Sequence, residues 1–64
     1  MRNFYVLTND SEEDKMLYFP TELKAREVAY NFLDREDLKY IEYGIMNYDG
    51  WANSCLVVLK NEVE

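Results

Sequence analysis

Carboxylates dominate the residues of this 64-residue chain that could take part in chemistry, with thirteen Asp and Glu against seven Lys and Arg. Histidine is absent, and Cys55 is the single cysteine. A Ser–His–Asp or Cys–His catalytic arrangement therefore cannot be built, and neither can a zinc site made of histidines and cysteines. Because Cys55 lies in an apolar stretch, we expect a buried and inert thiol.

Asp10, Glu12 and Asp14 alternate with other residues, as the first ligands of a calcium loop do. In an EF-hand loop that began at Asp10, the essential glycine would fall at Lys15 and the closing glutamate at Thr21. We therefore interpret this segment as the solvated acidic tip of a hairpin. We expect neither a metal nor a cofactor.

Paired carboxylates can also hydrolyse glycosides. That chemistry needs a cleft that holds a sugar and shifts the pKa of one carboxyl group. A chain of 64 residues with one predicted helix offers little room for such a cleft. We expect the protein not to be an enzyme.

Runs of β-branched and aromatic residues predict four strands. A six-residue polar connection between the first two favours a hairpin, and Asp49-Gly50 is a strong turn signal before the last. The third strand is expected to bend or bulge at Gly44. The predicted strands cover residues 4–8, 15–19, 38–48 and 54–60.

One helix is predicted over residues 21–35. Thr21 is a good N-cap, and Glu22 suits the positive end of the helix dipole. Apolar residues then recur at the spacing of one helical stripe. The stripe consists of Ala25, Val28, Ala29 and Phe32.

The predicted order of elements is β-β-α-β-β. The simplest architecture for this order is a small two-layer α+β domain, in which one helix packs on one face of a four-stranded antiparallel sheet. We expect a single domain over residues 1–64, with residues 61–64 as a frayed tail.

The predicted strands do not alternate apolar and polar residues, as half-exposed strands should. Phe4 and Val6 point to one face of the sheet, while Tyr5 and Leu7 point to the other. On the last strand, strict alternation places Cys55, Val57 and Leu59 opposite Leu56 and Val58. Since one helix covers one face, we expect the other to bind a partner or a second copy in a homodimer. The alternative is that bulges and tyrosine hydroxyls make this face tolerable in water.

The formal net charge of −6 opposes direct contact with nucleic-acid phosphates and with anionic membranes. It favours a basic protein partner, or it serves solubility. The first apolar run is too short for a signal peptide, and no stretch approaches the length of a membrane span. With a single cysteine, we expect a cytoplasmic protein.

Two acidic clusters and a group of aromatic residues are the candidate binding residues. The acids would steer a basic partner, and the aromatics would anchor it. The alternatives are a solvated surface for the acids and sheet packing for the aromatics; base stacking lacks the positive charge it needs. The candidates are Glu12, Glu13, Asp14, Asp34, Glu36, Asp37, Tyr40, Tyr43, Tyr48 and Trp51.

These features together predict a binding module that inhibits or adapts a larger basic protein, such as a nucleic-acid-binding enzyme. The acids, including Glu27 and Glu42, would then imitate phosphates. Small size, acidity and the order of elements are similar in general character to bacteriophage accessory proteins that inhibit host defence nucleases, although no motif carries the similarity. The alternative is a self-associating structural domain.

Overall fold

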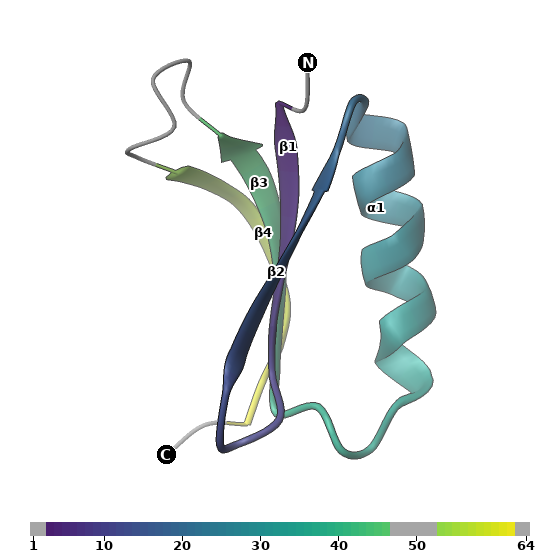
Figure 1. Ribbon diagram of the computed structural model, residues 1–64. Coiled ribbons are helices and arrows are strands. Elements are labelled where there is room, and N and C mark those ends of the chain that lie inside the picture. Colours follow the sequence, from purple (N-terminus) through teal and green to yellow (C-terminus); the bar gives the residue numbers. More distant parts are fainter. Residues whose placement is uncertain (1–2, 47–52, 63–64) are drawn as a thin grey trace.

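Four antiparallel strands form one sheet in the computed structural model, which describes residues 3–46 and 53–62 (Figure 1). The strands are β1 (Phe4–Asn9), β2 (Asp14–Phe19), β3 (Tyr40–Met46) and β4 (Asn53–Asn61), and they lie in the order β2-β1-β3-β4. Between β2 and β3 the chain forms the helix α1 (Glu22–Asn31) and the short 3-10 helix η1 (Phe32–Asp34). The predicted α+β fold, with one α-helix on one face of an antiparallel sheet, is confirmed.

The helix begins where its capping residue predicts. Thr21 has an extended backbone, and its Oγ1 accepts a hydrogen bond from the backbone N–H of Lys24 at 3.2 Å. The α-helix ends at Asn31, earlier than predicted, because the chain tightens there into η1. No helix within the described residues is long and apolar enough to cross a membrane.

One face of the sheet, the covered face, carries the hydrophobic core beneath α1. The helix packs mainly on β1 and β3. Ala25 and Ala29 are fully buried, and Val28 and Phe32 pack beside them, so the predicted stripe is confirmed. The fully or largely buried core residues are Val6, Ala25, Ala29, Leu38, Ile41 and Tyr43.

The opposite side of the sheet, the open face, has no described helix against it (Figure 1). Tyr5 and Leu7 of β1 belong to this face, since they alternate with Phe4 and Val6, which pack in or against the core. The predicted separation of these side chains is therefore confirmed for β1. The open face supplies the candidate site described below.

A bulge in β4 corrects the predicted alternation at Cys55. Gly44 pairs with Cys55 and Tyr43 pairs with Val57, which leaves Leu56 as an extra residue. The extra residue turns Cys55 away from the face of Val57 and toward Glu42. This irregularity falls beside Gly44 as predicted, but the inserted residue lies on the partner strand. A second irregularity falls between Ile41 and Glu42, opposite Leu59.

The last strand continues further than the sequence indicates. Asn61 pairs with Tyr40 as the final residue of β4. The backbone N–H of Glu62 then donates to the carbonyl oxygen of Lys39 at 2.7 Å. Residues 61 and 62 are thus part of the sheet edge and not a frayed tail.

Candidate partner-binding surface

Glu42 is a largely buried carboxylate at the centre of the open face. Its side chain comes from β3, and the residue is only 9% exposed. The hydroxyl of Tyr5 donates to Oε2 at 2.5 Å, and that of Tyr40 donates to Oε1 at 2.6 Å. The thiol of Cys55 also lies close to this carboxylate. Two hydroxyl donors, one on each oxygen, therefore hold the anion in a fixed orientation.

These contacts determine the protonation of the cluster. Burial by itself raises the pKa of Glu42, but the hydrogen bonds from Tyr40 and Tyr5, with the Cys55 thiol nearby, outweigh it and hold the pKa below the ordinary value of 4.5. The hydrogen bond to Glu42, together with burial, raises the pKa of Tyr40 to about 12. Burial and then the same carboxylate also raise the pKa of Tyr5. At neutral pH Glu42 is an anion, and both tyrosines are hydrogen-bond donors.

Gly44 makes room for the ring of Tyr5, its partner in the pairing of β1 with β3. A Cβ atom at position 44 would lie 2.8 Å from both Cε1 and the hydroxyl of Tyr5, and it would also collide with the carbonyl oxygen of Ser54. Any larger residue would displace the ring or β4. The glycine therefore allows the Tyr5 hydroxyl to reach Glu42.

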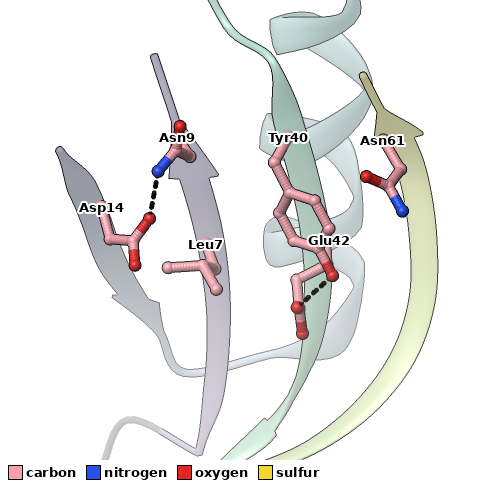
Figure 2. A pocket seen from close by; sticks show the side chains of 6 residues that line it. All are labelled: Leu7, Asn9, Asp14, Tyr40, Glu42 and Asn61. Atoms are coloured by element: carbon pink, nitrogen blue, oxygen red, sulfur yellow. Dashed lines mark hydrogen bonds between the residues drawn. The ribbon is translucent and has the colours of Figure 1, made fainter. Parts of the chain in front are cut away.

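A hollow of about 410 Å³ opens beside this cluster on the open face (Figure 2). Figure 2 shows the side chains of Leu7 and Glu42, which are paired neighbours on β1 and β3, with α1 behind the sheet. Carboxylates, side-chain amides, an aromatic ring and an aliphatic chain surround the hollow, which we call the Glu42 pocket. Its lining residues are Leu7, Asn9, Asp14, Tyr40, Glu42 and Asn61.

The β1–β2 hairpin tip is held by its own side chains. Asp10 Oδ1 accepts hydrogen bonds from the backbone N–H groups of Glu12 and Glu13, both at 3.1 Å, and these bonds lower the pKa of Asp10. Asn9 Oδ1 accepts from the N–H of Ser11, which has a left-handed backbone with φ of 83°. Within the described residues, no group of three or more Asp, Glu or Cys side chains could hold a metal.

The connection from η1 to β3 carries the second acidic cluster. Arg35 pairs with Asp37 there, and its Nε donates to Oδ1 at 3.1 Å, which lowers the pKa of Asp37. Lys60 of β4 fixes the same connection by donating to the carbonyl oxygen of Arg35 at 3.1 Å. The neighbouring residues Asp34 and Glu36, on either side of Arg35, are exposed.

The two clusters meet at one end of the molecule, together with the end of β4 (Figure 1). Asp10 of the hairpin acts electrostatically on Arg35 of the connection. We call this region the acidic end. Among the described residues, its carboxylates are Asp10, Glu12, Glu13, Asp14, Asp34, Glu36, Asp37 and Glu62, and its cations are Lys15, Arg35, Lys39 and Lys60.

The aromatic candidates fall in three different places. Tyr40 lines the Glu42 pocket together with Asp14. Tyr43 is 5% exposed in the core of the covered face, which favours the packing alternative for this residue and leaves it no surface to offer a partner. Tyr48 and Trp51 lie outside the described residues.

The residue that organises the pocket was not singled out from the sequence. Glu42 was expected only as one of many surface carboxylates, and Leu7, Asn9 and Asn61 were not expected at a site. One signal was present, since Glu42 is a lone carboxylate within a run of strand-forming residues, two positions before Gly44. A charge at such a position needs partners if its strand is central.

Cys55 also differs from expectation, because its side chain is exposed and not buried. The cause is its position on the edge strand β4, on the face that no described helix covers. Partial desolvation and the Glu42 carboxylate raise the pKa of the thiol. The thiol is therefore protonated at neutral pH and a poor nucleophile.

Comparison with protein-family models finds no match to this chain. No curated protein matches it. No solved structure matches it either. The function has to be inferred from the geometry and charge of the described residues.

Proposed function

We propose that the protein is a small cytosolic binding module that inhibits or adapts a larger basic protein. One observation carries the proposal: the acidic end and the Glu42 pocket adjoin on one side of the molecule, and Asp14 belongs to both. A partner that is drawn to the acidic end therefore meets a hollow and an uncovered sheet face beside it. A nucleic-acid-binding enzyme is the class of partner that fits.

Charge supports a basic partner. The net charge of −6 creates a field that attracts positive surfaces and speeds encounter. A groove that binds phosphates carries the complementary lysines and arginines. The carboxylates of the acidic end would occupy such a groove in place of nucleic acid, and no catalytic step is needed.

Apolar residues on the open face supply the anchor. Tyr18 is 38% exposed and Val58 is 47% exposed. Val58 pairs with Glu42, so apolar surface borders the pocket directly. Interfaces bury apolar side chains of this kind at their centre and place polar contacts at the rim.

A defined basic probe tests the proposal. We expect a fluorescent peptide of alternating lysine and arginine to bind the protein, with an affinity that falls steeply as salt rises, because exposed charges are screened beyond about 8 Å at physiological ionic strength. Fluorescence anisotropy over a salt series measures this. The double variant Glu12→Gln/Glu13→Gln should bind more weakly, mainly through slower association.

The matched control is Glu22→Gln/Glu27→Gln, which removes the same charge from the helix. If both double variants lose the same affinity, net charge alone attracts the peptide and the acidic end has no special role. A basic nucleic-acid-binding protein that binds the chain without competition from DNA would also contradict the proposal.

Self-association through the open face is a second candidate, favoured by the exposure of Tyr18 and Val58. It would bring two chains of net charge −6 together, which electrostatic repulsion opposes. Sedimentation velocity at micromolar concentration tests it. A dimer that Val58→Lys separates without unfolding the chain would favour this candidate, and a monomer at every concentration would exclude it.

A further inference from the structure

We propose that the Glu42 pocket receives an arginine side chain of the basic partner. The inference rests on the proposed function in one respect, that the partner is basic. It adds the place of docking and the chemical group that docks, a guanidinium. Arginine's stem and planar head would enter the hollow of about 410 Å³ between the ends of β1 and β3.

The pocket offers hydrogen-bond acceptors that match a guanidinium. A carboxylate has about four acceptor sites, and Glu42 uses two of them on Tyr5 and Tyr40. Asp14 accepts from Asn9 at Oδ1, and its Oδ2 adds a further acceptor. Asn61 contributes a side-chain carbonyl oxygen from β4.

The spread of these acceptors favours arginine over lysine. Glu42 comes from the inner strand β3, while Asp14 and Asn61 come from the opposite edge strands β2 and β4, so a planar fork would bind Glu42 together with one of these two. A guanidinium has five N–H donors in a fixed planar fork, whereas an ammonium is a compact charge. The ring of Tyr40 and the chain of Leu7 provide the aromatic and aliphatic surfaces on which arginine packs.

The anion is already in place before any partner arrives. Tyr5 and Tyr40 each fix one oxygen of Glu42, and Gly44 allows Tyr5 to do so. A preorganised acceptor loses little freedom on binding. Partial burial also strengthens its interaction with a cation, because the local dielectric constant is lower than in water.

Nuclear magnetic resonance with single amino-acid probes tests the inference. We expect N-acetyl-arginine amide to shift the amide signals of Leu7, Glu42 and Asn61 in a saturable way. N-acetyl-lysine amide should bind roughly tenfold more weakly, because it loses at least one charge-assisted hydrogen bond. The probes carry the same charge, so attraction to the acidic end cancels in the comparison.

Two pocket variants sharpen the test. Glu42→Gln and Asp14→Asn should each weaken the arginine probe about tenfold. Glu22→Gln and Glu27→Gln, which remove the same charge from α1, should change it less than about twofold, as expected for screened surface charges. Asp14 is exposed, so Asp14→Asn keeps the test valid even if Glu42→Gln disturbs the fold.

The outcomes separate this inference from the proposed function. If the arginine probe shifts only signals of the hairpin tip, or if pocket and control variants behave alike, the pocket assignment is overturned. Salt-dependent binding of the basic peptide would then still stand. If arginine seats in the pocket but the peptide shows no salt-dependent affinity, the pocket assignment stands and the proposed function fails.

Discussion

The two faces of the sheet bury side chains by opposite means. On the covered face, Val6 and Ile41 are fully buried beneath the alanines of α1, and the contacts are apolar. On the open face, Tyr5 is just as buried, but it is fixed by a hydrogen bond to Glu42 and by close packing on Gly44. The first arrangement closes one side of a small domain, and the second leaves a charged hollow accessible.

This difference indicates which face is available to a partner. The apolar packing of the covered face is non-directional, and its core residues are enclosed beneath α1. A carboxylate held by tyrosine hydroxyls is specific in position and in charge, and its network is satisfied without a ligand. Among the described residues, no buried side-chain nitrogen or oxygen atom lacks a hydrogen-bond partner. The open face is therefore stable alone while retaining acceptor capacity.

The largest effect should come from breaking the covered face. We expect Ile41→Ala to lower the free energy of unfolding by about 3 kcal/mol, because it leaves a cavity in the core. Urea denaturation followed by circular dichroism measures it. Since only apolar contacts are lost, the loss should be equal at pH 7 and at acid pH, and a strongly pH-dependent loss would contradict the distinction between the faces.

Gly44→Ala should have the next largest effect, of about 2 kcal/mol, because the added methyl group collides with Tyr5 and with the backbone of β4. Thermal unfolding measures the loss. In a nuclear magnetic resonance spectrum of the folded variant, the amide signals of Tyr5 and Glu42 should shift more than those of α1. An unchanged midpoint would show that the Tyr5 ring does not pack on Gly44.

Tyr5→Phe should cost about 1 kcal/mol, since it removes one hydrogen bond to Glu42 while keeping the ring. Tyr18→Phe is a matched control for the loss of a tyrosine hydroxyl elsewhere on the open face. Chemical denaturation of both variants gives the comparison. Equal losses would mean that the bond to Glu42 contributes nothing particular to stability.

The smallest effect concerns pH. The folded pKa of Glu42 is lowered, so its stabilising contribution is complete above the ordinary value of 4.5 and is lost as pH falls through the lower folded value. Glu42→Gln should therefore make the free energy of unfolding fall less steeply as the pH drops below 4.5. Asp10 and Asp37, whose pKa values are also lowered, should preserve part of the slope. Parallel acid-unfolding curves for variant and wild type would contradict this assignment.

The sequence was sufficient to predict the helix and the strands but not the Glu42 pocket. Periodicity predicts the stripe of Ala25 and Ala29, and capping chemistry predicts Thr21, because both depend on neighbours within one helix. The Glu42 cluster depends on Tyr5, 37 residues away, and on the bulge that redirects Cys55. Gly44 indicates the place of one bulge, but strand order and the strand that carries the extra residue follow from packing of the whole sheet.

The gathering of acids at one end has the same origin. The hairpin tip and the connection after η1 become neighbours because β1 pairs with both β2 and β3. From the sequence they are two separate clusters with an open choice between function and solubility. The pairing of Asn9 with both Asp14 and Tyr40 brings one cluster to the edge of the pocket.

One map of the bound surface tests the central claim most directly. The isotope-labelled protein would be titrated with the lysine–arginine peptide while all amide signals are followed. We predict that the shifts concentrate on the hairpin tip and on the pocket strands around Leu7, Glu42 and Asn61, with α1 unchanged. Shifts that concentrate on the outer surface of α1, or that spread evenly over the molecule, would contradict the assignment of the open face as the binding surface.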